Sequence, residues 1–263
     1  MDLNRRRFLR ASLACTAAAR FTSVAVAAPA PLPRIAWTAD GNFYDKDDWG
    51  SATMALRLLA GAGHQYRLVH FDFNSHIPQS SSTWEGQMVT SVLDSRGRYG
   101  FYSSVFFNAK PRNDAAVSNL RSCIMQATAS TAGGAPGPLN LCLAGPPDIL
   151  WQALQGVSMN QRRNVRVITH SSAYNESTGG VHTLAQCQGV VVMKIANQNQ
   201  RLNTKQNWGP WAFLNNSSRP ENQWVYNRMR ASGRADVSDS GMMYYLLYGN
   251  TTATVADYRA RLS

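Results

Sequence analysis

The sequence of 263 residues has few acidic residues and few cysteines. It carries 15 Asp and Glu against 26 Lys and Arg, a formal net charge of +11, and only four Cys. Once Cys15 is assigned to the leader described below, three cysteines remain, so the chain is no disulfide framework, although one bridge plus a free thiol stays open. No Cys or His pair has the short spacing typical of zinc ligands, which argues against a zinc site.

The first 28 residues are typical of a twin-arginine export signal. Three arginines at positions 5–7 precede an Ala-rich segment, and residues 25–27 offer a small-residue cleavage site. The apolar segment is short and is interrupted by Arg20, which argues against a membrane anchor. We therefore expect the twin-arginine export machinery to deliver the mature chain, residues 29–263, to the periplasm or out of the cell.

Removing this leader leaves 21 basic against 14 acidic residues, a formal charge of +7. No basic run interleaved with aromatic residues stands out in the remainder, so nucleic acid is not an expected partner. The mature chain is long enough for a single α/β domain with a substantial core. We expect one domain over residues 29–263, and the sequence leaves open whether it forms a homo-oligomer.

Strand-like and helix-like segments alternate along the mature chain. The apolar, strand-like runs are 34–37, 66–73, 102–107, 139–143, 165–169 and 190–195, and the helix-like stretches are 51–62, 85–93, 114–127, 149–154 and 222–231. Such alternation predicts an α/β fold, a mostly parallel, Rossmann-like open sheet with helices on both faces. Ligands of such sheets bind beyond the carboxyl ends of the strands.

Four carboxylates occur within nine residues after the first predicted strand. They are Asp40, Asp45, Asp47 and Asp48. Carboxylates packed this closely repel one another unless a cation or shared protons offset the repulsion, and Ca²⁺ or Mg²⁺ is the usual partner. The alternative is that Asp47 or Asp48 caps the following helix and the others are solvated.

Further polar residues follow other predicted strands. Asn74 lies where the second strand ends, and alternation would place His76 on the same side. His170 ends the fifth strand, where an imidazole can act as a general acid. Asp239 precedes an apolar helix near the C-terminus, and Trp208 lies in the long predicted loop 197–216, as part of a substrate lid or of the packing at the domain edge.

These motifs, in this order, resemble the nucleoside hydrolases of the inosine–uridine-preferring type, and in particular an exported nucleoside-hydrolase-like branch. Asp40, Asp47 and Asp48 match the later positions of that family's Asp-x-Asp-x-Gly-x-Asp-Asp loop, and residues 141–146 are similar to its strand that ends in Thr-Gly-Pro. Asn74 matches an Asn after its second strand, and residues 238–239 match its late His-Asp.

The resemblance implies a Ca²⁺ ion held by the side chains of Asp40, Asp48 and Asp239 and by the main-chain carbonyl of Ala144. It implies that Asp47 and Asn74 bind the hydroxyls of a ribose-like sugar, and that Asp40 helps to deprotonate a metal-activated water that attacks the anomeric carbon. The expected function is therefore Ca²⁺-dependent hydrolysis of N-glycosidic or related glycosidic bonds in a small sugar or nucleoside.

The sequence departs from the family pattern at three points. Six residues, 41–46, separate Asp40 from Asp47 where the family has three, and Thr38 replaces the first Asp of the loop. Ser238 stands where many members have His, the proposed acid that protonates the leaving group. A second function therefore stays open, a non-catalytic carbohydrate- or nucleoside-binding protein on the same fold.

Overall fold

The computed structural model describes residues 33–130, 132, 135–170 and 173–263. The predicted export signal, residues 1–28, lies outside the described residues. No helix within the described ranges is long and apolar enough to cross a membrane.

Six parallel strands form one sheet in the order β3-β2-β1-β4-β5-β6. The strands are β1 (Arg34–Ala39), β2 (Leu68–Phe73), β3 (Phe106–Asn108), β4 (Leu139–Ala144), β5 (Val165–Thr169) and β6 (Val191–Lys194). The predicted α/β fold with a parallel sheet is confirmed. From β1 the chain winds outward to β3, and from β4 it winds outward the other way, so the winding reverses between β1 and β4. Crevices beyond the carboxyl ends of strands at such a reversal are the usual binding sites of open sheets.

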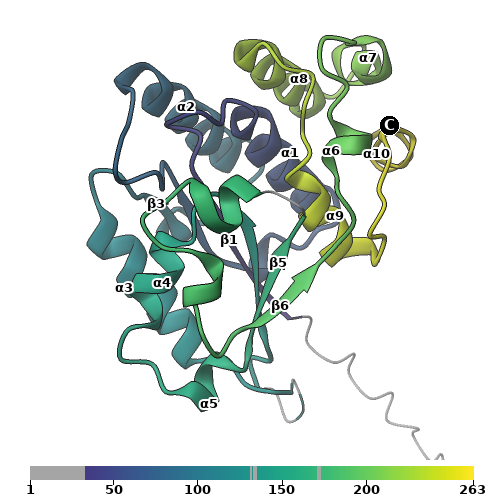
Figure 1. Cartoon of the computed structure of the whole chain (residues 1–263). Helices are drawn as coiled ribbons and strands as arrows, with labels where there is room; N and C mark the ends of the chain where they lie inside the picture. The colour runs from purple at the N-terminus through teal and green to yellow at the C-terminus, as the bar shows by residue number, and fades with distance from the viewer. Residues whose placement is uncertain (1–32, 131, 133–134, 171–172) are drawn as a thin grey trace, which may run out of the picture.

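Helices cover both faces of the sheet (Figure 1). One face carries α1 (Asp48–Gly61), α2 (Ser82–Arg98), α8 (Pro220–Ser232), α9 (Ser240–Tyr248) and α10 (Val255–Leu262), whereas the other carries α3 (Asn113–Met125), α4 (Asp148–Leu154) and α5 (Met159–Arg162). Two short helices, α6 (Asn199–Leu202) and α7 (Ala212–Asn215), complete the set.

Side chains that alternate along the central strands pack into two separate cores, one on each face of the sheet. In β1, Ile35 and Trp37 enter the core under α1, whereas Ala36 enters the core under α3 and α4. Trp37 stacks on Phe71 of the neighbouring strand with ring centroids 5.8 Å apart. Because both faces are covered, the central strands are largely apolar on both faces, although β2 also carries the buried His70 and Asp72, and this is why mainly apolar runs identified them in the sequence.

The prediction of one long loop over residues 197–216 is wrong. It contains α6, a 3-10 turn at Gly209–Trp211, and α7. Trp211 is fully buried, and its indole nitrogen donates to the Thr204 hydroxyl at 3.2 Å. Helix α10 was not predicted, although Thr254 and Asp257 form a capping box at its start.

The three cysteines of the described chain are buried and unbridged. Cys142 lies in the central strand β4, Cys123 in α3, and Cys187 in the loop before β6. The bridge that the sequence left open does not form, so the fold depends on its two hydrophobic cores rather than on a cross-link.

Candidate functional site

The acidic loop begins at the carboxyl end of β1 and ends at the first turn of α1. Gly41 turns the chain directly after Asp40 with φ +62°, a conformation that favours glycine. Gly145, which follows β4, lies so close that a Cβ atom there would be 2.7 Å from the Asp40 backbone nitrogen. The neighbouring strand end thus fixes the backbone of Asp40.

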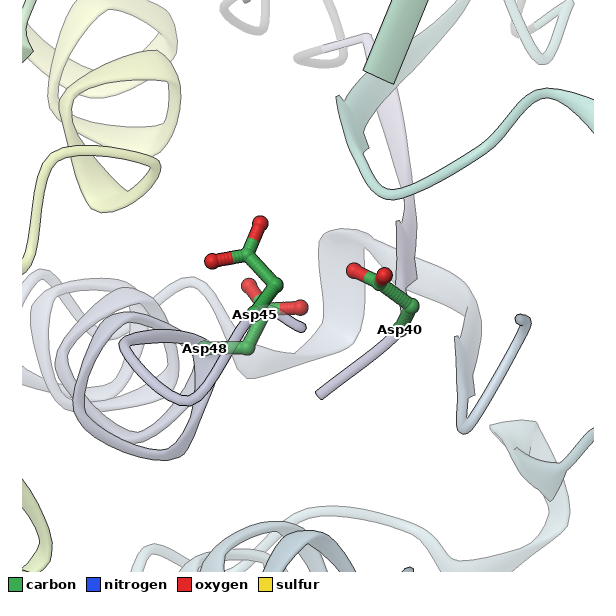
Figure 2. A group of neighbouring side chains, drawn as sticks. All are labelled: Asp40, Asp45 and Asp48. Carbon is green, nitrogen blue, oxygen red and sulfur yellow. The ribbon is translucent and has the colours of Figure 1, made fainter. Parts of the chain in front are cut away.

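Three carboxylates of this loop converge on one point. Oxygens of Asp40, Asp45 and Asp48 lie within 4.8 Å of one another. Figure 2 shows the Asp45 and Asp48 carboxylates next to each other, with that of Asp40 facing them across a gap. A second group, Asp45, Asp47 and Asp239, also has oxygens within 4.8 Å of one another, so Asp45 belongs to both groups.

The cluster is buried and lacks compensating partners. Oδ1 of Asp40 and both carboxylate oxygens of Asp48 are buried without a hydrogen-bond partner among the described residues. Burial raises the pKa of Asp40 to about 7, and it raises the pKa of Asp48 well above its usual range, with the charges of Asp45 and Asp40 adding to the effect. The free energy of ionising this cluster is high unless a cation is present.

Asp45 and Asp236 are affected in the same way. Burial, followed by the charges of Asp47 and Asp40, raises the pKa of Asp45 well above its usual range. Burial raises the pKa of Asp236 to about 8, with the charge of Asp47 as the next cause. Carboxylates from both ends of the chain therefore share one site of uncompensated negative charge.

His170 and Asp239 join the site from β5 and from the start of α9. His170 Nε2 lies 2.7 Å from Asp239 Oδ1, and both side chains are buried. If Nε2 carries the proton and donates to Asp239, Nδ1 is left as an acceptor, and Nδ1 has no partner within the described chain. Burial raises the pKa of Asp239, while the hydrogen bond from His170 opposes this rise.

The segment after β5 contributes Tyr174 to the site. Tyr174–Thr178 forms a π-helical turn, a rare element that is frequent at functional sites. The Tyr174 hydroxyl donates to Asp40 Oδ2 at 3.1 Å and contacts the Phe43 carbonyl at 3.3 Å. The hydroxyl thereby fixes the orientation of the Asp40 carboxylate.

Asp148, at the start of α4, holds the end of the same segment. Its carboxylate accepts hydrogen bonds from the backbone nitrogens of Val181 and His182, at 3.1 and 3.0 Å, and lies 2.7 Å from His182 Nδ1. Stacking of His182 on Trp151, with ring centroids 3.6 Å apart, completes the anchor. The turn that carries Tyr174 is thus tied to the loop that follows β4.

The carboxylates of Asp45, Asp47, Asp236 and Asp239 line a cleft of about 220 Å³, called the acidic cleft below. All of its lining residues are polar or charged: Asp45, Asp47, His170, Asn175, Asn199, Asn203, Arg234, Asp236, Ser238 and Asp239. Arg234 Nη1 lies 2.8 Å from Asp47 Oδ1. This ion pair satisfies Asp47 but leaves the inner carboxylates of the cluster without a cation.

The structure brings together most of the residues predicted to bind a metal. Asp40, Asp48 and Asp239 act on one another electrostatically, since the charge of Asp239 contributes to the raised pKa of both others. Ala144 pairs with Ala39 at the carboxyl end of β4, one residue before Asp40. Asp47 occupies the N-cap position of α1 but makes no capping hydrogen bond with its side chain, which turns to Arg234 instead.

Asn74 and His76 lie beside the cluster rather than in the lining of the acidic cleft. The Asn74 backbone nitrogen donates to the Asp40 carbonyl at 2.9 Å, but its side chain amide donates to Asn108 Oδ1 on β3. His76 Nδ1 lies 2.6 Å from the Gln79 carbonyl. Asn74 thus supports the backbone of Asp40, and the His76 backbone nitrogen donates to Asn42 Oδ1 in the acidic loop at 3.1 Å.

Trp208 lies further away, directly before the 3-10 turn Gly209–Trp211, and packs against α8. Its ring makes an edge contact with Tyr226, and the guanidinium of Arg230 lies 4.4 Å from the ring centroid. Trp208 is not among the described residues that line the acidic cleft. This location corresponds to the packing alternative considered for this ring from the sequence.

Sequence reasoning did not assign Asp45, Asp236, Arg234 or Tyr174 to the site. Asp45 was counted in the acidic loop, yet its inward direction depends on a backbone turn in which Tyr44 has φ +59°. Asp236 lies three residues before Asp239, and that spacing was the available signal. For Tyr174 and Arg234 the sequence contains no comparable signal, because a hydrogen bond to Asp40 and an ion pair to Asp47 are tertiary contacts.

The donor set fits a hard divalent cation. Ca²⁺ and Mg²⁺ prefer carboxylate and carbonyl oxygens, and the cluster offers such oxygens from Asp40, Asp45, Asp48 and Asp239. The unpartnered buried oxygens of Asp40 and Asp48 are the independent sign that a charge-compensating group belongs there.

One known protein is similar to this chain over most of its length. "Uncharacterized protein P22" of Formosa agariphila is 30% identical over 243 residues, which cover 86% of this chain and 87% of that protein. No protein-family model matches the chain, and no solved structure matches it.

Proposed function

We propose that this chain, which belongs to the same family as the uncharacterized Formosa agariphila protein, is a cation-dependent hydrolase of N-glycosidic, nucleoside-type, or related glycosidic bonds. The observation that carries the proposal is the set of buried carboxylates with unpartnered oxygens at the carboxyl ends of the central strands. Such a cluster is costly to maintain for mere packing, because each ionised carboxylate without a partner destabilises the fold.

Ca²⁺ is the ion we expect, in agreement with the resemblance to nucleoside hydrolases. Asp40, Asp45 and Asp48 would hold it from one side and Asp239 from the other. The bound ion would lower the pKa of a water molecule and so make hydroxide available near neutral pH.

The protein's own groups supply orientation and proton transfer. Tyr174 holds Asp40 by its hydrogen bond, so that the second oxygen of Asp40 is free to accept a proton from water. His170 positions Asp239 through Nε2 and retains an acceptor at Nδ1. Carboxylates around the reacting sugar also stabilise the positive charge that develops as the glycosidic bond breaks.

The polar lining indicates the part of the substrate that enters. The acidic cleft has no apolar residue in its lining among the described residues, and the amides of Asn199 and Asn203 lie in its wall. Amides and carboxylates together provide donors and acceptors for a polyhydroxylated ring. A sugar therefore fits the cleft better than an aromatic base does.

A second candidate function is binding of a sugar or nucleoside without catalysis. Ser238 favours it, because a hydroxyl cannot protonate a leaving group as an imidazole does. Ser238 lines the acidic cleft, and its backbone nitrogen donates to Asp236 Oδ1 at 2.9 Å.

We keep the proposal that the chain acts after twin-arginine export, in the periplasm or outside the cell.

The first test is calorimetric titration of Ca²⁺ into the chelator-stripped, dialysed protein. We expect one site, and we expect Asp48→Asn and Asp239→Asn each to abolish binding, because they remove ligands contributed by two distant parts of the chain. Asp94→Asn on the exposed side of α2 is the matched control and should bind as the parent does. A parent protein that takes up no Ca²⁺ would overturn the proposed function.

The second test separates hydrolase from binder. The Ca²⁺-loaded protein is assayed on a panel of nucleosides and glycosides for release of reducing sugar, in parallel with His170→Gln. An enzyme should lose turnover in this variant, since the proton acceptor at His170 Nδ1 is removed, while Ca²⁺ binding should persist. Affinity for a sugar without release of product by the parent would favour the binding function.

A further inference from the structure

A second hollow lies at the opposite end of the sheet from the acidic cleft. It measures about 260 Å³ and is lined by Arg67, Arg166, Asn140, Tyr245, Met193 and Leu246, with two further residues. Asn140 and Arg166 are the second residues of β4 and β5, and Arg67 directly precedes β2. Tyr245 and Leu246 come from the last turn of α9. Figure 1 shows α9 beside β5 on this side of the sheet. We call this hollow the arginine hollow.

Strand register places two of its polar side chains side by side. Asn140 of β4 pairs directly with Arg166 of β5, so both side chains emerge on the same face of the sheet. Ile35 of β1 pairs with Asn140 and also with Leu68, the residue that follows Arg67. The two arginines therefore approach the hollow from opposite sides of β1 and β4.

Arg67 is a buried cation without a carboxylate partner. Only 4% of the residue is exposed, and the single hydrogen bond of its guanidinium within the described chain runs from Nε to the Pro33 carbonyl at 3.1 Å. Burial lowers the pKa of Arg67, and no acidic residue is a cause that opposes this. No carboxylate lines the hollow among the described residues. A buried guanidinium in such surroundings is stabilised by an external anion.

We propose that the arginine hollow binds a tetrahedral oxyanion of the phosphate or sulfate type, free or as a monoester. Arg67 and Arg166 supply the positive charge, and guanidinium groups match the geometry of such oxyanions with paired hydrogen bonds. The Asn140 amide can donate one more hydrogen bond. Met193 and Leu246 form an apolar wall on which the organic part of a monoester can pack.

This site is independent of the acidic cleft, because the two lie at opposite ends of the strands and carry charges of opposite sign. The oxyanion proposal therefore stands or falls apart from the hydrolase proposal.

The test is calorimetric titration of sodium sulfate, and separately of sodium phosphate, into the metal-free full-length chain at an ionic strength held constant with sodium chloride. We expect saturable binding to one site. Arg166→Gln should weaken it at least about tenfold, since a charge-assisted hydrogen bond is lost. Because Arg166 is exposed, this variant should fold as the parent does. Arg67→Lys keeps the charge but loses the planar fork, and should also weaken binding.

Arg163→Gln is the matched control, because Arg163 is exposed, lies near the start of β5 and does not line the hollow. Binding of sulfate or phosphate that Arg166→Gln weakens and Arg163→Gln leaves unchanged supports the proposal. No saturable binding, or equal effects of the two variants, overturns it. Sodium acetate is the third ligand, and acetate that binds as well as sulfate would overturn the assignment to a tetrahedral oxyanion.

Discussion

Replacing Asp48 by Asn should stabilise the metal-free protein at pH 8. An acid whose pKa is raised in the folded state favours folding below its unfolded pKa, and this contribution is lost as the pH rises through the folded value. For Asp40 the pKa rises from 3.8 to about 7 on folding, so the contribution is lost between these pH values. It corresponds to a free energy of roughly 4 kcal/mol at about 1.36 kcal/mol per pKa unit. Asp48 is as deeply buried, and both of its oxygens lack partners in the described chain.

Asp48→Asn removes one charge from this cluster, and the amide that it introduces can donate to a carboxylate oxygen of Asp40. We expect a gain on the order of 3 kcal/mol at pH 8 without a cation, or roughly 6 to 12 °C in Tm for a domain of this size. At pH 4, where the carboxylates are protonated, the gain should nearly vanish. Thermal unfolding followed by circular dichroism after chelation and dialysis measures both, with Asp94→Asn as the surface control.

Ca²⁺ should make the parent more stable than Asp48→Asn, which reverses the order of stability expected without the ion. A ligand at a thousand times its Kd stabilises the folded state by about 4 kcal/mol, and the parent should gain this while Asp48→Asn gains little. The reasoning would be refuted if the metal-free variant were less stable than its parent at pH 8 by the same amount as at pH 4. The carboxylates would then not repel one another.

Three further substitutions test the surroundings of the cluster. Gly145→Ala should weaken Ca²⁺ binding by tenfold or more in calorimetry and destabilise the fold by about 1 to 3 kcal/mol, because its Cβ would press on the backbone of Asp40 and overpacking carries such a cost; unchanged affinity would contradict this. Tyr174→Phe should lower the free energy of unfolding by only about 1 kcal/mol but should also lower turnover, since only the hydroxyl with its contacts to Asp40 Oδ2 and the Phe43 carbonyl is removed; an equal rate would argue against a role for the bond to Asp40. Thr38→Val should lower the free energy of unfolding in urea by about 1 to 3 kcal/mol, because the buried Asp72 Oδ1 loses a donor at 2.7 Å, and a neutral effect would show that the carboxylate finds another partner.

The positions of the strands could be predicted because the sheet is buried on both faces. Runs such as 139–143 and 165–169 are mainly apolar, interrupted by Asn140 and Arg166, and the structure has β4 at Leu139–Ala144 and β5 at Val165–Thr169. The third strand was placed too early, at 102–107, because Ser103–Val105 forms a 3-10 turn and only Phe106–Asn108 pairs with β2. An apolar run shows that a segment is buried, but hydrogen bonding to a neighbour decides where pairing begins.

The convergence of Asp40 and Asp239 could also be predicted, but through the resemblance to nucleoside hydrolases, because Asp239 lies at the start of α9 rather than at the end of a strand. What could not be predicted is which loop side chains turn inward. Asp45 does so after a backbone turn at Tyr44, whereas Asp47 approaches Asp45 and Asp239 and also pairs with Arg234. Side-chain direction in a loop depends on tertiary contacts, whereas in a strand it alternates with the sequence.

The buried, unbridged thiols make the molecule its own reporter of unfolding. Cys142 is fully enclosed in the central strand, and burial raises the pKa of the Cys187 thiol to about 12. A thiol in either position reacts with an aromatic disulfide reagent only when its surroundings open, because the thiolate is the reactive form. In the leaderless chain, the labelling rate at Cys142 would therefore measure opening of the sheet centre, and the rate at Cys187 would measure opening of the loop before β6. Comparing the two rates with and without Ca²⁺ would show how far a cation in the acidic cleft restrains the rest of the sheet.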